Sequence, residues 1–343
     1  MISGFDRPAS NAGLSTQSRR WVRLACAYAA LVGGSTVAIQ CLTDRLLPAT
    51  LIAFGPRWVL ALPLVVLAGA GLAVLPVRQM PLAGAGLGLV AGMLMFGVLD
   101  FRLGTGRSSL SPSLRVMTYN LGGSTVTSKT LDEFLRREHV DVAAIQECPF
   151  YDYGPKYLGW HFYYGGDLCL VSRYPFTRLD PVVEPDADER EGNPGPVRVE
   201  ISTGTGRFQF MNVHLETVRG GLEALAGNGW AGLSLFAHNR FEAARDSVLA
   251  RQLIRSVATP FIVAGDFNLS VESEIYKQNW GDLRNAFSSC GRGFGHTKDA
   301  SVYGIRIDHV LTSDQWECTD TRVLSTPYDG DHSPLIVDLR RKQ

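Results

Sequence analysis

Six hydrophobic segments in the last two-thirds of the sequence each end in residues that can bind a metal ion or a phosphate. In chain order these residues are Asn120, Glu147, His214, Asp266 with Asn268, Asp308, and Asp331 with His332. A hydrophobic strand that stops at a carboxylate, amide or imidazole presents that group at the rim of a sheet, where active sites gather. Together these groups suit hydrolysis of a phosphate ester with the help of a hard divalent cation.

Glu147 is the best candidate for a metal ligand. It follows an apolar run that fixes its backbone, and Mg²⁺ prefers a carboxylate beside waters and substrate phosphate. Asn120 would add a neutral oxygen, and Asp331 would serve the same ion. Because these oxygen ligands have no soft partners, the sequence predicts Mg²⁺ or Mn²⁺ as the cofactor. A single strand-end carboxylate is as often a solvated surface group, so the prediction rests on the whole set.

The segment GDFN, residues 265–268, predicts a second part of the site. Gly265 would let the backbone turn sharply out of its strand, and Asp266 and Asn268 would face the same side. A carboxylate there can orient an attacking water, and an amide can donate to a phosphoryl oxygen. In isolation the same four residues would be an ordinary turn.

Asp308 and His332 have the types expected of a proton-accepting pair. A neutral histidine can take a proton from water near neutral pH, and a carboxylate on its other nitrogen fixes the tautomer. His309 follows Asp308 directly and should therefore point to the opposite face of the strand. We interpret His309 as structural.

His214 and Arg219 are candidates for binding the phosphate itself. His214 would contact a phosphoryl oxygen or assist the leaving oxygen. Arg219, in the loop just after it, would pair with a second phosphate through two parallel hydrogen bonds. An isolated loop arginine is usually a solvated surface group, which is the alternative for Arg219.

These residues need a scaffold of alternating strands and helices. Apolar runs predict strands at 114–120, 142–147, 168–172, 208–215, 261–265, 305–311 and 334–339. A capping box at Thr130 and Glu133 predicts one helix, and helical spacing predicts a longer one at 236–257. The pattern indicates a single α/β domain at 114–343, long enough for one sizeable core.

The first third of the chain predicts a membrane region at residues 21–101. The uncharged runs 24–43, 58–77 and 79–99 are each about long enough to cross a bilayer as a helix. A cleaved signal peptide fits poorly, because two further runs follow the first. The Gly- and Ser-rich stretch 102–113 then predicts a linker. The chain is therefore expected to be an integral membrane protein with the lipid bilayer as a partner.

The positive-inside rule favours a cytoplasmic tail at residues 1–20. Arg7, Arg19, Arg20, Arg23 and Arg78 lie on one side of the expected membrane, and Arg45, Arg57, Arg102 and Arg107 lie on the other. This bias is only five to four. Three crossings would place the α/β domain outside the cytoplasm, whereas two crossings would place it inside.

Charge and cysteine content restrict the function further. Residues 113–343 hold 24 Lys and Arg against 30 Asp and Glu, whereas non-specific nucleic-acid binders usually carry the opposite balance. Nucleic acid is therefore the less favoured substrate. The cysteines of this part are Cys148, Cys169, Cys290 and Cys318. We favour isolated packing cysteines over disulfides, although an even number is compatible with disulfides outside the cell.

The segments TYN, QE, NVHL, GDFN, RIDHVL and GDHSP, in this order, resemble the endonuclease/exonuclease/phosphatase superfamily of DNase I-like enzymes. The resemblance implies a four-layer α/β/β/α sandwich and Mg²⁺-dependent hydrolysis of phosphate esters. It implies that Asn120 and Glu147 hold metal and that His214 contacts phosphate. It also implies that Asp266 and Asn268 position water and phosphate, and that Asp308 orients His332 as the base with Asp331 beside it.

One departure and one further likeness bear on the substrate. Many members have Ser-Asp-His at the last motif, where this chain has Gly330-Asp331-His332. LVSRYPF (170–176) and HLETVRGGLEAL (214–225), with the preceding spans, look most like the bacterial membrane-anchored branch, some members of which dephosphorylate undecaprenyl pyrophosphate. We therefore expect a membrane-anchored phosphatase or phosphodiesterase, with a membrane-tethered nuclease as the alternative. A catalytically dead scaffold would lack Glu147, Asp266 or His332, and the sequence has all three.

Overall fold

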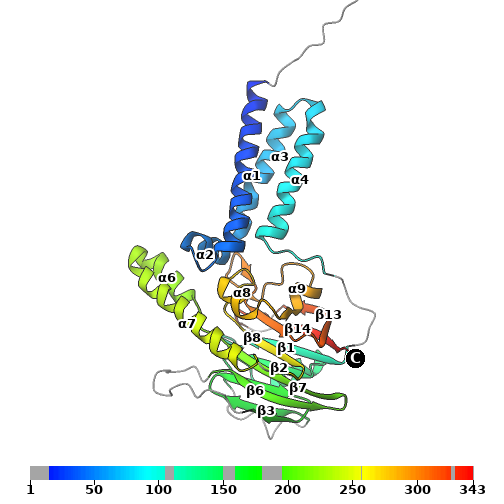
Figure 1. Ribbon diagram of the computed structural model, residues 1–343. Coiled ribbons are helices and arrows are strands. Elements are labelled where there is room, and N and C mark those ends of the chain that lie inside the picture. The colour runs from blue at the N-terminus through cyan, green and yellow to red at the C-terminus, as the bar shows by residue number, and fades with distance from the viewer. Residues whose placement is uncertain are drawn as a thin grey trace, which may run out of the picture. The chain divides into compact units, whose positions relative to one another are not determined.

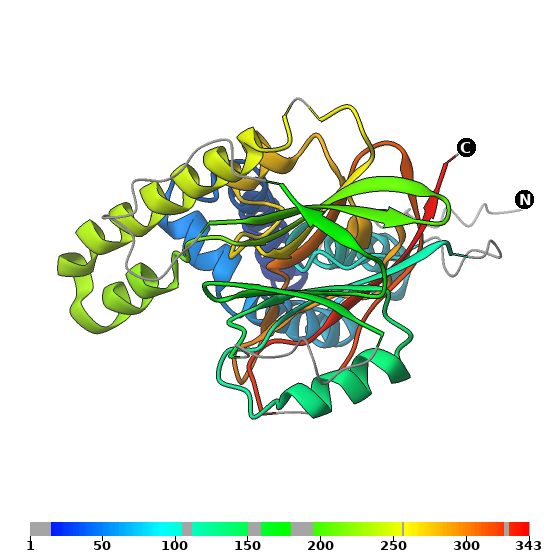
Figure 2. The same cartoon turned by 90° about the horizontal axis from the view of Figure 1, so that it is seen from below.

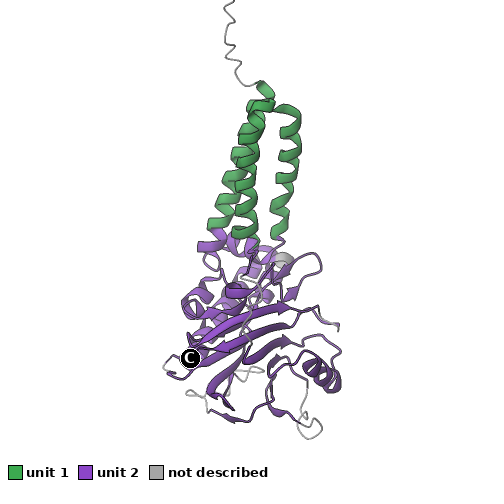
Figure 3. Ribbon diagram, turned by 90° about the vertical axis from the view of Figure 1, so that its right-hand side faces the viewer, with its two compact units in different colours: residues 1–37, 57–99 green, residues 38–56, 100–343 purple. Residues whose placement is uncertain are grey.

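The structure, a computed structural model, describes residues 15–104, 112–149, 159–179, 195–255, 257–325 and 329–342 (Figure 1). The chain forms two compact units, which Figure 3 colours separately. The smaller unit is Met1–Val37 with Arg57–Leu99, and the larger unit is Ala38–Pro56 with Asp100–Gln343. Most of the predicted linker at 102–113 and of the predicted tail at 1–20 lies outside the described residues.

The smaller unit consists of helices with apolar, exposed surfaces. The three candidate membrane spans are Thr16–Leu42, Arg57–Val74 and Val77–Val98, and only residues 38–42 of the first belong to the larger unit. They are built from α1 (Thr16–Leu42), η1 (Arg57–Ala61), α3 (Leu62–Val74), η2 (Val77–Gln79), α4 (Met80–Gly92) and η3 (Met93–Val98). Side chains such as Val65 and Leu82 are 72% and 81% exposed, which for so many apolar residues is typical of a lipid-facing surface. The three predicted runs thus form helices long and apolar enough to cross a membrane.

The larger unit is built on two six-stranded sheets that lie face to face (Figure 2). The first sheet has the order β13 (Trp316–Val323), β14 (Leu335–Arg341), β1 (Leu114–Asn120), β2 (Val142–Gln146), β4 (Leu168–Ser172), β3 (His161–Gly165). The second has the order β5 (Phe176–Arg178), β6 (Val197–Thr203), β7 (Gly206–His214), β8 (Phe261–Asp266), β12 (Asp308–Thr312), β9 (Arg284–Asn285). A small hairpin, β10 (Lys298–Asp299) with β11 (Gly304–Ile305), completes the set of described strands.

Alternation along each strand divides its side chains between two cores. In β1, Val116 contributes to the cluster that both sheets share, whereas Met117 contributes to the cluster on the outer face. Successive side chains of a strand point to opposite faces, so the next inward positions after Val116 are Thr118 and Asn120. The polar strand ends noted in the sequence therefore lie on the face between the sheets.

Helices cover the outer face of each sheet. On the first sheet, α5 (Ser128–Arg137) buries Leu131, Phe134 and Leu135 against strand residues. The other helices of the larger unit are α2 (Leu47–Phe54), α6 (Arg219–Asn228), η4 (Gly229–Gly232), α7 (Leu233–Gln252), α8 (Glu274–Trp280) and α9 (Ala286–Cys290). Of these, α6, α7 and α8 share an apolar cluster with the outer face of the second sheet (Figure 2). The predicted four-layer α/β/β/α sandwich, preceded by three apolar helices, is confirmed.

Some local predictions need correction. The capping box of α5 is formed by Thr127 and Thr130 and not by Thr130 and Glu133, so the helix begins earlier than predicted. The strands β3, β5, β6 and β13 were not predicted. In β13 polar residues such as Glu317 and Asp320 interrupt the apolar pattern, because the strand lies at the edge of its sheet and part of its surface faces solvent.

Residues 38–56, which the sequence assigned to the membrane region, pack on the larger unit. The Asp44 carboxylate accepts a hydrogen bond from the Ser273 hydroxyl, and the Asp44 carbonyl accepts one from Arg240. Phe54, at the end of α2, packs against the same apolar cluster as α7 and α8. Because these contacts are made by single residues far apart in sequence, hydropathy alone could not reveal them.

The four cysteines of residues 113–343 form two disulfides, Cys148–Cys169 and Cys290–Cys318. The expectation of isolated packing cysteines is therefore wrong. Cys148 comes two residues after β2 and Cys169 lies in β4, and these strands are antiparallel neighbours. The pairing depends on sheet topology, which the spacing of the cysteines in the sequence does not reveal.

His309 lies on the outer face of β12, as predicted from its place next to Asp308. One ring nitrogen, Nε2, donates to the Leu269 carbonyl over 2.8 Å, and Nδ1 accepts from the Asn285 amide over 3.2 Å. Phe267 and Tyr276 contact the ring. Burial, followed by the charge of Arg306, lowers the pKa of His309 to about 4, so the imidazole is neutral in the folded protein.

This depressed pKa predicts a specific acid sensitivity. The folded pKa lies below the unfolded value near 6.5, so the contribution of His309 to stability is present above pH 6.5 and is lost as the pH falls toward 4. His309→Gln can keep both hydrogen bonds but cannot titrate. Lowering the pH from 7.5 to 5 should reduce the free energy of unfolding of the wild type by about 2 kcal/mol more than that of His309→Gln. Thermal unfolding at the two pH values measures this difference. Equal acid sensitivity of the two proteins would contradict this assignment.

Candidate active site

The candidate site lies where the inward-facing strand ends of the two sheets meet. In the first sheet β1 and β2 are parallel, with Asn120 paired to Gln146. In the second sheet β7 and β8 are parallel, with His214 paired to Asp266. Because parallel neighbours end at the same edge, each sheet presents its polar groups together.

Buried amides join the two sheets beneath this edge. Gln146 Nε2 donates to Asn212 Oδ1 over 2.7 Å, and Asn212 Nδ2 donates to the carbonyls of Ile145 and Cys169. Asn120 Nδ2 donates across the gap to Asp266 Oδ2 over 3.0 Å. The network fixes the register between the sheets, since an unpaired buried amide would cost about 1–3 kcal/mol.

Asn120 brings two carboxylates together. The same Nδ2 that reaches Asp266 also donates to Glu147 Oε1 over 3.0 Å. Its oxygen, Oδ1, accepts from the Gly122 backbone N–H over 2.8 Å. The structure thus gives Asn120 a positioning task between the two carboxylates, and direct contact of its oxygen with a metal stays a prediction.

Glu147 is held at the mouth of the site by its backbone and by Gly122. Its φ of 49° is in the left-handed region, which turns the exposed side chain back over the end of β1. A Cβ atom at Gly122 would lie only 2.2 Å from Glu147 Oε2. The carboxylate can occupy its place only because residue 122 has no side chain.

Asp308 and His332 form the expected pair. His332 Nδ1 lies 3.0 Å from Asp308 Oδ2, and both residues are buried. The register of β12 against β8 places Asp308 beside Asp266, whose Oδ2 lies 3.7 Å from His332 Nε2. Burial lowers the pKa of His332, but the charge and hydrogen bond of Asp308, with the charge of Asp266, raise the pKa to about 9. The imidazole therefore carries a proton at neutral pH, and it can accept one from water only after losing that proton.

Lys298, in β10, was missed by the sequence analysis. Its Nζ lies 2.8 Å from His332 Nε2 and donates to Asp331 Oδ2 over 2.6 Å. The isolated bridge between Lys298 and His332 holds the hairpin against the site. No sequence signal marked Lys298, because a single lysine in a loop is usually solvated.

Asp167 was also missed. It lies in the turn between β3 and β4, and its Oδ2 is 2.6 Å from His214 Nδ1. Burial lowers the pKa of His214, but the Asp167 hydrogen bond and the charges of Asp266, Asp167 and Glu147 raise the pKa to about 9. His214 therefore carries a proton at neutral pH and can donate to an anionic oxygen.

Asp266 and Asn268 form a turn that is tied in place. Asp266 Oδ1 accepts from the Asn268 backbone N–H over 2.8 Å, and Asn268 Nδ2 donates to the Leu215 carbonyl over 2.9 Å. Burial, followed by the charge of Asp308, raises the pKa of Asp266. Gly265 lies within β8, and a Cβ atom there would lie 2.0 Å from the Val213 carbonyl oxygen. The glycine is therefore needed for the close pairing of β8 with β7, and not mainly for the sharp turn that the sequence predicted.

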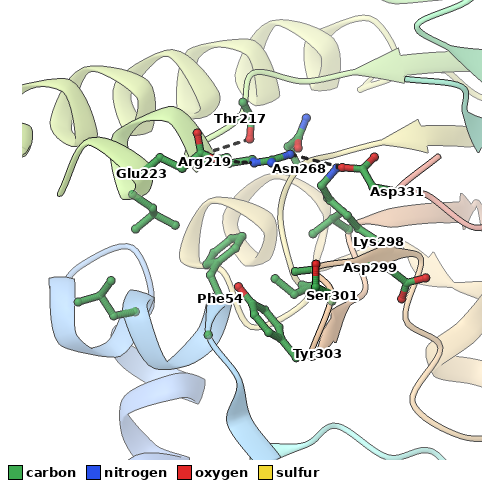
Figure 4. Close-up of a pocket in the computed structure, with 16 residues that line it drawn as sticks. Phe54, Thr217, Arg219, Glu223, Asn268, Lys298, Asp299, Ser301, Tyr303 and Asp331 are labelled. Carbon is green, nitrogen blue, oxygen red and sulfur yellow. Dashed lines mark hydrogen bonds and ion pairs between the residues drawn. The ribbon is translucent and has the colours of Figure 1, made fainter. Parts of the chain in front are cut away.

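Arg219 and Asp331 lie close together at the outer edge of the candidate site (Figure 4). Arg219 Nε donates to Glu223 Oε1 over 2.7 Å, and its Nη1 lies 3.4 Å from Asp331 Oδ2. Asp331 is thus paired with Arg219 and Lys298. Burial raises the pKa of Asp331, but Lys298, His332 and Arg219 lower it further, so the net pKa is below the usual value. The predicted metal role of Asp331 stays a prediction, since its described contacts are to cations.

A cavity of about 370 Å³ collects most of these groups. Of the nine predicted residues it is lined by Glu147, His214, Arg219, Asp266, Asn268 and His332, and the two missed residues, Asp167 and Lys298, line it as well. Asn120 and Asp308 lie behind it as positioning groups, through their hydrogen bonds to Asp266 and His332.

The donor set fits a hard divalent cation. Carboxylates in or beside the cavity outnumber lysine and arginine, and Asp308 Oδ1 is buried without a hydrogen-bond partner in the described part of the chain. Ligand atoms of Asp266, Asp308 and His332 all lie within 4.8 Å of one another. Glu147 and Asp266 are the residues best placed to hold the ion, because one amide fixes both. A bound divalent cation would polarise a phosphoryl oxygen and offset the negative charge of this cavity.

The family of this chain follows from a comparison of its sequence with known families. The sequence profile of the Endonuclease/Exonuclease/phosphatase family matches residues 117–332. The chain belongs to this family. Its members hydrolyse phosphate ester bonds and are generally dependent on divalent metals, so the larger unit is a phosphate ester hydrolase domain.

Several solved structures are similar to this chain at low sequence identity. A family protein from Bacteroides thetaiotaomicron is 17% identical with a TM-score of 0.50, and the match covers 67% of this chain and 98% of that one. A mannosyl-6-phosphatase from the same organism is 19% identical over 66% of this chain and all of that one, with a TM-score of 0.49. The human Nocturnin catalytic domain is 18% identical over 68% of this chain and 96% of that one, with a TM-score of 0.48. A comparison with curated proteins found no match.

The packing of Glu147 over Gly122 predicts that a substitution of Gly122 weakens the metal site although no proposed metal ligand is replaced. Gly122→Ala places a methyl group where the Glu147 carboxylate lies, so the carboxylate must move. We expect Gly122→Ala and Glu147→Gln both to weaken Mg²⁺ activation at least tenfold while the unfolding temperature changes little. Gly123→Ala is not a suitable control because Gly123 has a φ of 67°, so Gly204→Ala, in open space, serves instead. Normal Mg²⁺ activation of Gly122→Ala would show that this contact does not matter.

The histidine assignment predicts a large difference between neighbours in sequence. His332→Ala should lower kcat by roughly 10²–10⁴-fold, and Asp308→Asn should be similarly severe, because one accepts the proton and the other orients it. The base works unprotonated, so wild-type activity should rise with pH up to a limit at or below about 9, and His332→Ala should lack this rise. His309→Gln should keep most activity, and equal losses at both histidines would mean that the wrong one is assigned.

Proposed function

We propose that the protein is a membrane-anchored, Mg²⁺- or Mn²⁺-dependent hydrolase acting on a lipid-linked phosphate or pyrophosphate, such as undecaprenyl pyrophosphate. The main support is that the hydrolase domain joins the candidate spans through very short segments. The first span ends at Leu42, and Asp44 already contacts α8 through Ser273. The third span ends at Val98, and the Asp100 carboxylate pairs with Arg306. Two to three residues reach roughly 7–11 Å, so we expect the domain to act on a substrate held in the same membrane as the spans.

The residues of the cavity can perform hydrolysis in one displacement. Water attacks phosphorus while His332 Nε2 takes one of its protons, and Asp308 stabilises the resulting imidazolium. The bond from phosphorus to the leaving oxygen breaks, and protonated His214 donates to an oxygen of the phosphoryl group or to the leaving oxygen. Glu147 and Asp266 would hold the cation, and Asn268 would complete the turn that positions Asp266. Lys298 and Arg219 supply positive charge for a second phosphate.

Two observations support an extracytoplasmic domain. Residues 43–56 follow the first span and residues 100–343 follow the third, yet both belong to one compact unit, as is expected if the second and third spans both cross the membrane. Disulfides persist in oxidising compartments, and the four cysteines of residues 113–343 are all paired. With a cytoplasmic N-terminus, three crossings put the domain outside.

The substrate class is tested with the full-length protein. Removing residues 1–112 would also remove residues 38–56, which are part of the larger unit, so truncation is a poor test of membrane anchoring. We expect purified protein in liposomes to release phosphate from a polyprenyl pyrophosphate with Mg²⁺ or Mn²⁺, and EDTA to abolish the reaction. Plasmid DNA should be cleaved far more slowly. Efficient DNA cleavage that falls steeply with salt would instead establish a tethered nuclease.

The orientation is tested separately in cells. Three crossings from a cytoplasmic N-terminus predict that alkaline phosphatase fused after residue 343 is active. Green fluorescent protein exported at the same position by the general secretory route should be dark. Bright fluorescence with an inactive phosphatase would place the domain in the cytoplasm and favour an intracellular substrate.

A further inference from the structure

A second cavity of about 530 Å³ adjoins the active-site cavity. Thr217, Arg219, Asn268 and Lys298 line both, so the two spaces share one rim. Figure 4 shows this rim, with Arg219 and Asn268 on one side of the second cavity and Lys298 with Asp331 next to them. A molecule bound at the hydrolytic residues can therefore extend directly into the second cavity.

The walls away from the rim are mostly apolar. Leu51 and Phe54 come from α2, Leu222 comes from α6, and Tyr303, Ile305 and Ile307 come from the hairpin β10–β11 and the segment after it. Figure 4 shows Phe54 and Tyr303 close to each other in this wall. Leu51 is 48% exposed, although an apolar neighbourhood would ordinarily cover a leucine. One continuous space thus passes from charged groups to hydrocarbon-like groups.

This arrangement is suited to an amphiphile. Arg219 and Lys298 at the rim attract phosphate, whereas the apolar walls gain from covering methylene or methyl groups. Thr217 and Asn268 belong to both cavities, so the apolar part begins immediately beside the phosphate-binding part. A hydrocarbon chain attached directly to the phosphate fits this better than a diacylglycerol, whose polar ester groups would lie at that point.

The position of α2 in the chain also favours a lipid. Leu51 and Phe54 are three residues apart and share one helix face. Residue Leu47, where α2 begins, is separated from the end of the first candidate span at Leu42 by at most roughly 18 Å of extended chain. The chain thus keeps α2 close in sequence to a candidate span, as expected for a site that takes a membrane lipid.

We propose that the second cavity binds the phosphate-proximal part of a single hydrocarbon chain, and that Leu51 and Phe54 make the enzyme prefer prenyl or alkyl phosphates over water-soluble ones. This inference rests on the proposed function, because it assigns the chain of the same lipid-linked substrate. Arg219 and Lys298 hold the phosphates, and α2 with the β10–β11 hairpin holds the chain.

Binding measured without turnover tests the proposal. The probes are prenyl diphosphates of five, fifteen and twenty carbons, added to full-length His332→Ala in detergent micelles with Mg²⁺. We expect the two longer probes to bind at least tenfold more tightly than the five-carbon probe. Leu51→Ser and Phe54→Ser, each added to His332→Ala, should each remove most of this gain and leave five-carbon binding unchanged.

Matched controls separate the cavity from general effects. Leu235→Ser and Phe241→Ser, in the same background, remove exposed apolar side chains of α7 that do not line the cavity, and they should keep the full chain-length gain. All variants share the same micelles, so partition of the probe into detergent cancels in the comparison. Leu51 is half exposed, so Leu51→Ser is expected to fold even if Phe54→Ser, whose side chain packs on the core, does not.

The outcomes distinguish this inference from the proposed function. Binding that does not depend on chain length, or that the Leu51 and Leu235 variants change equally, would overturn the cavity assignment. If the binding of phosphatidic acid depended on Leu51 as strongly as the binding of the fifteen-carbon probe, the single-chain claim would be overturned. A clear chain-length gain in His332→Ala, together with no turnover of any prenyl diphosphate by wild type, would leave the cavity assignment standing and refute the proposed reaction.

Discussion

The site depends on hydrogen bonds that buried amides make between the two sheets. Asn120 and Gln146 end neighbouring strands of one sheet, and their amides donate to Asp266 and Asn212 of the other. An apolar interface alone would let two sheets slide, because hydrophobic contact has no direction. The amides do have a direction, and each would be left unpaired by a small shift. They therefore place Glu147, from the first sheet, beside Asp266, His214 and His332.

The charges of the cavity follow from this alignment. Several carboxylates meet in a buried space, and two histidines have raised pKa values as a result. A phosphate would be repelled by this space unless cations balanced it. Lys298 supplies one, protonated His214 supplies another, and the grouping of Glu147 and Asp266 suits a divalent ion. A phosphate would be bound only when cations outweigh the repulsion of the carboxylates, and this requirement would link metal binding to catalysis.

Much of the site could be predicted because strand alternation is a local property. Asn120, His214, Asp266 and Asp308 all continue the inward-facing positions of apolar strands, and His309 correctly fell on the other face. Lys298 and Asp167 could not be found, since their value comes only from contact with histidines distant in sequence. The same reason hid both disulfides and the packing of residues 38–56 on the larger unit. Edge strands such as β13 escaped prediction because solvent exposure breaks their hydrophobic pattern.

The central claim is that carboxylates from two sheets form one metal site under the control of Asn120. Electron paramagnetic resonance of Mn²⁺ titrated into the purified full-length protein measures this directly, without any substrate. The account predicts tight Mn²⁺ binding in the wild type and in His309→Gln, and a loss of at least tenfold in affinity for Glu147→Gln, Asp266→Asn and Asn120→Ala alike. Unchanged Mn²⁺ affinity in Glu147→Gln and Asp266→Asn, with the proteins folded, would contradict it.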